Sequence, residues 1–171
     1  GARFYERMEI RDAIAYLRVI NQPNDDLALE RIINKPKRGI GAASLQALHQ
    51  LARAEQIPFW TAISKIIETD ELRPAARKSL TKVVEDFQRW RSLVETEDHA
   101  DLAGMVLDES GYTGMLKADR SPEAAGRLEN LRELVSALKE FENLGGFLEH
   151  ISLVMENAET TNVDQVSIMT L

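Results

Sequence analysis

The fold of this chain turns on one stretch of sequence, Ile32-Ile33-Asn34-Lys35-Pro36-Lys37-Arg38-Gly39-Ile40-Gly41-Ala42-Ala43-Ser44-Leu45. The stretch joins two amphipathic segments through a Gly-hydrophobic-Gly turn. Glycine permits a positive φ and a close approach of the backbone, and Ile40 is placed to fill the gap between the two helices. The pattern therefore predicts two helices joined by a tight turn.

The start of the second helix is expected to present free backbone amides from Gly41 to Ser44. Such amides, aided by the helix dipole, bind phosphate. Basic side chains just before the turn add long-range attraction for a polyanion. This arrangement is typical of a helix-hairpin-helix, which binds the DNA backbone without reading the base sequence. The predicted DNA-binding residues are Lys35, Lys37, Arg38, Gly39, Ile40, Gly41, Ala42, Ala43 and Ser44.

Charge is distributed unevenly along the chain. The 171 residues carry 28 acidic and 21 basic side chains, for a formal net charge of −7. No acid lies between Glu30 and Glu55, whereas that interval holds five basic residues. From Glu95 onward there are 16 acids against 5 bases, which would repel nucleic acid. By itself the basic interval would be interpreted as a solvated surface patch. The Gly-Ile-Gly turn within it favours DNA binding instead.

Outside the turn, apolar residues recur at spacings of three and four, which predicts helices. The chain is therefore expected to be a single all-α domain of orthogonally packed helices over residues 1–171. The predicted helices cover about 6–20, from Asp25 to before Pro36, after Gly41, from Pro58, 74–94, 99–108, from Ser121-Pro122, and after Gly145-Gly146. Residues 112–117 are expected to form a turn or a helical fragment. Residues 166–171 are rich in branched side chains and are expected to form a short strand belonging to the sheet of a larger protein.

Several classes of site find no support in the residues. There is no cysteine, and no Gly-rich loop ending in Gly-Lys-Ser or Gly-Lys-Thr. The three histidines, His49, His99 and His150, stand far apart and lack metal-ligand spacing. No catalytic set and no metal site are predicted. No apolar run approaches the length of a membrane span and no secretion signal is evident, so a soluble, cytoplasmic protein is expected.

Several spaced segments, taken together and in order, resemble the accessory subdomain 2B of the UvrD/PcrA/Rep-type superfamily 1 DNA helicases. The segments are Arg3-Phe4-Tyr5-Glu6-Arg7-Met8-Glu9-Ile10-Arg11-Asp12, Ala15-Tyr16-Leu17-Arg18, Asn24-Asp25-Asp26, Arg31-Ile32-Ile33-Asn34, Arg38-Gly39-Ile40-Gly41, Arg127-Leu128-Glu129-Asn130-Leu131-Arg132-Glu133-Leu134 and Val166-Ser167-Ile168-Met169-Thr170-Leu171. The last resembles the opening of helicase motif V. Close members often have a glycine where Ala2 stands, and more polar residues in place of Ala42-Ala43.

The resemblance implies that the chain is one part of a bacterial ATP-dependent 3′–5′ DNA helicase of DNA repair or replication restart. ATP and Mg would bind in motor domains outside this chain, so the fragment itself would not be catalytic. Residues 1–5 and 165–171 would be the junctions to motor domain 2A, with Gly1, Ala2, Thr170 and Leu171 as hinges. The expected partners are the duplex DNA backbone, the parent's own motor domains, and repair proteins or a second copy. No membrane partner is expected.

An alternative function stays open at this point. The chain would then be a helical protein–protein interaction module whose Gly-Ile-Gly turn only packs two helices and makes no contact with DNA.

Overall fold

The computed structural model describes the backbone of residues 2–170 and the side chains of residues 2–161. Over that backbone the chain forms ten helices and no strand, which confirms the predicted all-α fold. The helices are α1 (Ala2–Glu6), α2 (Met8–Asn21), α3 (Asp26–Ile32), α4 (Ala42–Glu55), α5 (Phe59–Ile66), α6 (Pro74–Ser92), α7 (His99–Glu109), α8 (Tyr112–Ala118), α9 (Ala124–Leu138) and α10 (Leu144–Thr170).

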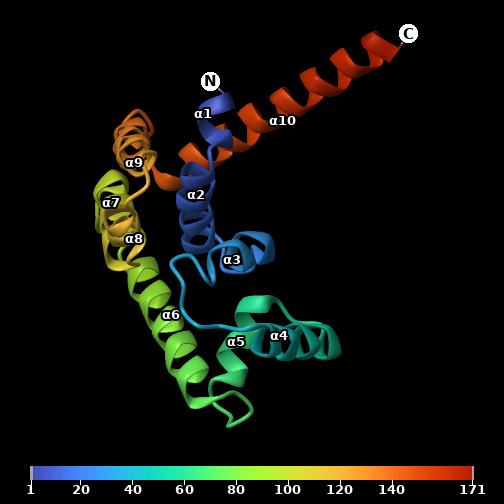
Figure 1. The fold of residues 1–171 in the computed structure, drawn as a ribbon, viewed down its shortest axis with the longest axis vertical. Helices are drawn as coiled ribbons and strands as arrows, with labels where there is room; N and C mark the ends of the chain where they lie inside the picture. The colour runs from blue at the N-terminus through green and yellow to red at the C-terminus, as the bar shows by residue number, and fades with distance from the viewer. Residues whose placement is uncertain (1, 171) are drawn as a thin grey trace.

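Helix α2 lies at the centre of the molecule (Figure 1). Ten of its 14 residues are buried, because α1, α3, α6, α7, α9 and α10 all pack against it. A helix that is apolar on nearly every side is stable only when other helices surround it. The polar groups that α2 does bury, described below, are therefore held from several directions at once.

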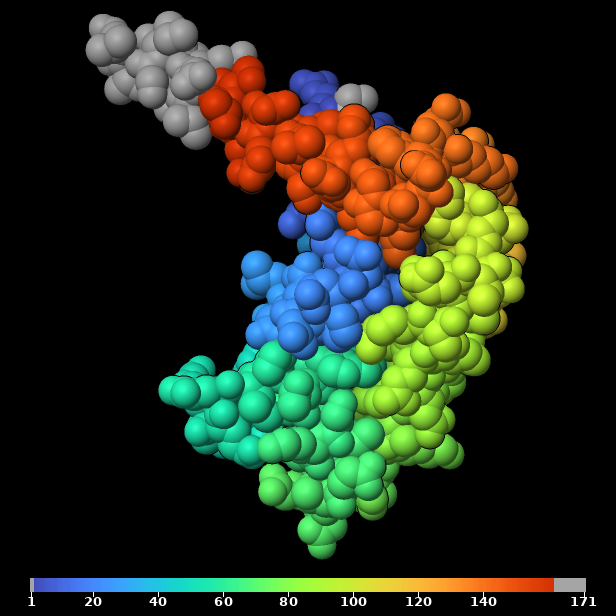
Figure 2. Space-filling view, turned by 180° about the vertical axis from the view of Figure 1, so that it is seen from behind, coloured from blue at the N-terminus to red at the C-terminus, as the bar shows by residue number. Residues whose placement is uncertain are grey.

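The other helices form two groups at opposite ends of the molecule. Helices α7, α8 and α9 pack on one another near one end, and α4 and α5 pack on each other at the other end (Figures 1 and 2). The long helix α6 connects the two groups. In Figure 2 the molecule is hollowed between α10 and α4, and the segment that contains α3 lies at the back of this hollow.

An aromatic cluster fills the core between α2 and α6. The rings of Tyr16 and Phe87 stack with centroids 5.8 Å apart, and Trp90 meets Phe87 edge-on at 5.0 Å. Tyr112 of α8 lies edge-on to Tyr16 at 6.4 Å. Such edge and stacked contacts stabilise beyond the apolar area that they bury. Tyr16 thus has a fixed position from which its hydroxyl can hold a neighbouring segment.

Several predicted helix starts are confirmed. The Asp25 carboxylate accepts a hydrogen bond from the amide of Ala28, 3.1 Å away, and so caps α3. Pro58 precedes α5, and Pro74 occupies the first turn of α6, where a missing amide costs nothing.

Two predicted starts differ by a few residues. Helix α10 begins at Leu144, so Gly145 and Gly146 lie inside its first turn rather than before it. The reason is Asn143, whose side-chain oxygen accepts a hydrogen bond from the Gly146 amide at 2.8 Å and caps the helix. Helix α9 begins at Ala124, two residues after the Ser121-Pro122 pair that was expected to open it.

The two ends of the chain also differ from expectation. Ala2 begins the short helix α1, which was not predicted and which stops at Arg7, where the backbone becomes extended. Residues 166–170 continue α10 instead of forming a strand, so the predicted terminal strand is not observed. A strand needs hydrogen-bond partners on a neighbouring strand, whereas a helix satisfies its own backbone. Gly1 and Leu171 lie outside the described residues.

Candidate nucleic-acid interface

The loop of residues 33–41 connects two helices that pack on different neighbours. Helix α3 packs chiefly on α2, and α4 packs chiefly on α5. The loop therefore crosses between two parts of the molecule. Its shape depends on contacts of its own.

Asn34 fastens the loop to itself. Its side-chain amide donates to the carbonyl of Ile40 at 2.7 Å, and its oxygen accepts from the Ile40 amide at 3.1 Å. The same oxygen accepts from the Arg38 amide at 3.4 Å. The Ile40 side chain is only 3% exposed, so it fills the interior as the sequence predicted. Asn34 and Ile40 together fix the backbone before α4 begins.

The two glycines of the turn have different roles. Gly39 has a φ of +74°, a left-handed conformation that other residues rarely adopt. Gly41 is extended, with a φ of −81° and a ψ of 178°, and a Cβ atom added there would meet nothing within 4 Å. The positive φ expected of the turn is therefore confirmed for Gly39, whereas Gly41 leaves open space beside the first turn of α4.

The first amides of α4 are available to a ligand. Leu45 is the first residue of the helix whose amide reaches a carbonyl, that of Gly41 at 3.0 Å. Within the described part of the chain, the amides of Ala42, Ala43 and Ser44 have no acceptor. Gly41, Ala42 and Ala43 are exposed, and Ser44 is half-buried. This turn is an array of donors facing water, with no side chain capping it.

The three predicted cations differ in how they are held. Lys37 is exposed and makes no ion pair or hydrogen bond with its side chain to any described residue. Lys35 is half-buried, with its Nζ 3.5 Å from a carboxylate oxygen of Asp12. Arg38 points into the protein. Lys37 is therefore the one of these three that the structure leaves entirely to solvent.

Arg38 holds the end of α3 to the core. Its Nη1 donates to the carbonyls of Ile32 at 2.7 Å and Ile33 at 3.1 Å, which are groups that a helix terminus leaves unpaired. Its Nη2 donates to the hydroxyl of Tyr16 at 2.6 Å, and the guanidinium carbon lies 5.9 Å from the centre of that ring. The Tyr16 hydroxyl in turn donates to the carbonyl of Lys35 at 2.5 Å.

A buried carboxylate reinforces this attachment. Asp12 of α2 is 1% exposed and accepts from Nε of Arg31 at 2.8 Å and from the hydroxyl of Tyr112 at 2.7 Å. With Lys35 also close by, Asp12 links α2, α3, α8 and the loop. Burial raises the pKa of the Tyr112 hydroxyl, and its hydrogen bond to Asp12 raises it further. Burial likewise raises the pKa of Tyr16, although the Arg38 charge opposes the effect.

Sequence reasoning missed Asn34, Asp12 and Tyr16 as residues that shape the site. One signal was present for two of them. Asp12 and Tyr16 are four residues apart, so they share a face of α2, and apart from Glu9 that face is apolar. A carboxylate and a phenol on an apolar face indicate a buried polar contact, although the pattern does not name its partners.

A cleft of 500 Å³ separates the loop from α6. Lys37 and Lys82 line it together with two acids, Asp86 and Glu109. Lys82 is paired with Asp86 at 2.7 Å, and the hydrogen bond from Trp90 to Glu109 lowers the pKa of that carboxyl. This side of the loop is thus of mixed charge, unlike the acid-free sequence from Arg31 to Ala54.

Two other kinds of feature are absent from the described residues. Among their side chains, no group of three or more histidines, aspartates or glutamates lies together in a way that would hold a metal ion. None of their helices combines the length and the apolar character that crossing a membrane requires.

Comparisons with known proteins extend over the whole sequence. A family model described as the UvrD-like helicase C-terminal domain matches residues 1–171. The chain is 44% identical over 173 residues to a DNA helicase II of Rickettsia typhi, covering 100% of this chain and 26% of that protein. It is 33% identical to an ATP-dependent DNA helicase PcrA of Bacillus subtilis over 186 residues, again with 100% of this chain and 25% of the relative covered.

A DNA helicase II of Escherichia coli is 34% identical over 188 residues, with 100% of this chain and 25% of the relative covered. The chain thus spans about a quarter of the length of the curated relatives that it matches. Because the family model matches every residue of the sequence, the chain belongs to the UvrD-like helicase C-terminal domain family.

Proposed function

We propose that this chain is the accessory subdomain 2B of a larger ATP-dependent DNA helicase, and that its α3–α4 loop binds the backbone of duplex DNA. Family membership and the names of the relatives support the first part, because those proteins are DNA helicases of about four times this length. ATP and Mg²⁺ would be held by the motor domains of the parent. The parent would act in DNA repair or replication restart, in the bacterial cytoplasm.

The observation that carries the DNA-binding role is the row of unpartnered amides at Ala42, Ala43 and Ser44. These donors follow a loop whose shape is already fixed by Asn34 and Arg38. Phosphate oxygens accept well from such amides, and the helix dipole favours their negative charge. Because Gly41 has no Cβ, a phosphate group can approach the backbone closely. Lys37, four residues before Gly41 in the chain, is exposed and adds charge attraction.

Binding of this kind does not depend on the base sequence, since it uses backbone donors and phosphates alone. While the motor domains translocate, the subdomain would hold the duplex ahead of them. Ala2 and Thr170, together with Gly1 and Leu171, would be the hinges about which it swivels. The subdomain would also contact the parent's motor domains, repair proteins or a second copy. Which of these contacts form would depend on its orientation about the hinges.

Fluorescence anisotropy with a labelled duplex tests the proposal. Lys37→Ala is expected to weaken binding and to reduce the slope of log K against log salt by about 1. Gly41→Ala is expected to weaken binding without changing that slope, because it adds bulk and removes no charge. Arg53→Ala is the matched control, since Arg53 is an exposed cation on α4 whose side chain has no partner among the described residues.

The outcomes separate this proposal from its alternative. If Lys37→Ala and Arg53→Ala lost the same duplex affinity, binding would depend on the overall charge of the protein and not on the loop. A chain that binds no duplex even at low salt would instead favour the protein-interaction module. One observation supports that alternative as a second function: Leu27 on α3 is 81% exposed, a large apolar side chain left in water.

A further inference from the structure

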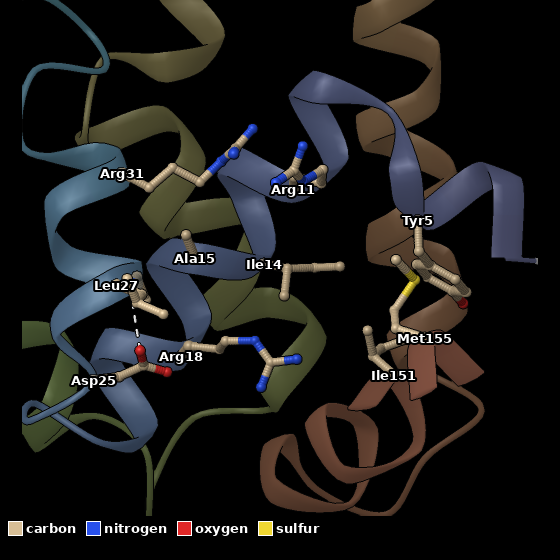
Figure 3. Close-up of a pocket in the computed structure, with 11 residues that line it drawn as sticks. Tyr5, Arg11, Ile14, Ala15, Arg18, Asp25, Leu27, Arg31, Ile151 and Met155 are labelled. Atoms are coloured by element: carbon tan, nitrogen blue, oxygen red, sulfur yellow. Dashed lines mark hydrogen bonds between the residues drawn. The ribbon is translucent and has the colours of Figure 1, made fainter. Parts of the chain in front are cut away.

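A groove beside Leu27 lies apart from the α3–α4 loop (Figure 3). Its volume is 520 Å³. Helix α2 forms its floor with Ile14 and Ala15, and α3 forms one wall with Leu27. The opposite wall consists of Tyr5 from α1 and of Ile151 and Met155 from α10. None of the residues 33–44 lines it, so whatever binds here does not occupy the proposed DNA site.

The floor of the groove follows a helical stripe. Arg11, Ile14, Ala15 and Arg18 stand at the first, fourth, fifth and eighth positions of one face of α2. Two cations thus bracket an apolar centre, and their backbone positions are about 10 Å apart along the helix axis. Ile14 and Ala15 lie at the bottom of the groove and are only 6% and 4% exposed, so the exposed apolar surface of the groove comes chiefly from its walls.

The three arginines of the groove differ in what they already bind. Arg11 is exposed, and its side chain has no hydrogen bond or ion pair with the described residues. Arg18 makes one hydrogen bond, to the Ser152 hydroxyl at 3.2 Å. Arg31 is engaged by Asp12. The lone acid of the lining, Asp25, is used as the cap of α3. Arg11 and Arg18 therefore retain most of their donors for an anionic partner.

The composition of the groove favours a protein partner over a nucleic acid. Phosphates gain nothing from Leu27 or from the apolar floor, and the Asp25 carboxylate repels them. A protein helix, by contrast, gains from burying Leu27, Met155 and Tyr5. Arginine, methionine and aromatic residues are the types enriched at protein interfaces. An amphipathic helix laid in a groove is a common way to satisfy both features.

We propose that this groove binds an amphipathic helix of a partner protein that carries two carboxylates seven residues apart with apolar residues between them. On a helix lying along α2, those carboxylates have the same rise as Arg11 and Arg18 and meet both guanidinium groups. The apolar residues between them cover Ile14 and Ala15 and contact Leu27. This site does not rest on the proposed DNA contact.

The test uses a labelled helical peptide with glutamate at two positions seven apart and leucine at the two positions between them that share their face. A second peptide has lysine in place of both glutamates. Anisotropy titrations are run with the wild-type chain, with the double variant Arg11→Glu/Arg18→Glu, and with Leu27→Ser. The matched control is Arg53→Glu/Arg120→Glu, which has the same net charge and places it at exposed arginines outside the groove.

The wild-type chain is expected to bind the glutamate peptide and to discriminate against the lysine peptide. In Arg11→Glu/Arg18→Glu the affinity for the glutamate peptide should fall by about tenfold or more, and the lysine peptide should now bind the better of the two. Leu27→Ser should also weaken binding, whereas the control double variant should bind as the wild type does. The Lys37→Ala variant should retain full peptide affinity even if duplex binding is lost.

Four results would overturn the proposal. The first is a wild-type chain that binds neither peptide or both equally. The second is a control double variant that loses as much affinity as Arg11→Glu/Arg18→Glu. The third is displacement of the peptide by duplex DNA, which would make the groove a nucleic-acid site. The fourth is a dimer in sedimentation that Arg11→Glu/Arg18→Glu dissociates, which would make the occupant a second copy of this chain.

Discussion

The guanidinium group of Arg38 donates to the hydroxyl of Tyr16, 2.6 Å away, and lies over the Tyr16 ring. These residues are 22 positions apart, and the contact ties the loop before α4 to the central helix α2. Arg38 belongs to the cations expected to attract DNA, yet its donors are directed at Tyr16 and at the carbonyls that end α3. We expect it to position the loop.

Replacing Arg38 by alanine should therefore lower both stability and duplex affinity while leaving the salt dependence of binding almost unchanged. A hydrogen bond to a charged group contributes about 1.5–3 kcal/mol when it is well buried. Because Arg38 is only half-buried, the three bonds together are expected to contribute about 2–3 kcal/mol, which the variant should lose. Urea unfolding and anisotropy at several salt concentrations measure the two effects. If the variant kept its stability and lost one unit of salt slope, the guanidinium would have to be a phosphate ligand.

The second prediction concerns Asp12, the buried carboxylate shared by Arg31, Lys35 and Tyr112. Asp12→Ala leaves those donors without an acceptor in the interior, which should cost about 3–5 kcal/mol of unfolding free energy. Asp12→Asn keeps the shape and one acceptor oxygen, so it should lose less. Asp108→Ala, at an exposed acid of α7, is the control. An equal loss in Asp12→Ala and Asp108→Ala would contradict the role assigned to Asp12.

The two glycines of the turn provide a matched pair for the third prediction. Gly39→Ala forces a Cβ into a left-handed conformation, for which we expect a loss of about 1–2 kcal/mol. Gly41→Ala meets no neighbouring atom and needs no change of φ, so its loss should be the smaller, limited to the weaker capping by alanine of about 0.5–1 kcal/mol. Thermal unfolding of both variants decides the order, and the reverse order would contradict the assignment of strain to Gly39.

The fourth prediction concerns alkaline pH. The pKa values of Tyr16 and Tyr112 are both raised, chiefly by burial. A phenol with a raised pKa in the folded state keeps its proton longer there than in the unfolded chain. Its stabilising contribution is therefore complete below the unfolded value of about 10 and is lost as the pH rises beyond it. Unfolding free energy measured from neutral pH upward should fall steeply above about pH 10.

Tyr112→Phe tests this assignment. The variant removes one of the three phenols with a raised pKa and should show a shallower fall above that pH. It should also be less stable near neutrality, because Asp12 loses a donor. Burial raises the pKa of Tyr5 as well, but that side chain is only half-buried, so Tyr5→Phe should change the alkaline slope less than Tyr112→Phe does. Identical alkaline slopes for the wild type and Tyr112→Phe would exclude Tyr112 as a source of the effect.

The helices were predictable where local signals set them. Asp25 and Pro74 mark the starts of α3 and α6 through bonds and sterics within a few residues. The direction of Arg38 was not predictable, because its partner Tyr16 lies on another helix and a charge in a sequence has no orientation. Asn34 was missed for a related reason: its bonds to Ile40 exist only once the loop is closed.

The prediction of a terminal strand was wrong for a related reason, because a strand depends on partners that lie elsewhere in the sequence. Branched residues at 166–171 favour an extended backbone, but the state of a segment with no neighbouring strand among the described residues is decided by its own hydrogen bonds. The predicted row of amides, by contrast, follows from the first turn of any helix, so Gly41 to Ser44 could be placed from sequence alone. Which of the three predicted cations is left unpaired could be learned only from the folded chain.

Asn34 orders the loop before any ligand binds, whereas many recognition loops become ordered only when they bind. Because the Asn34 amide fixes both backbone groups of Ile40, the conformational entropy of this segment is surrendered when the polypeptide folds. Association with a rigid rod such as a double helix then requires little further ordering. Hydrogen exchange at the Ile40 amide should consequently proceed at the pace of opening of the surrounding structure, whether or not nucleic acid is present.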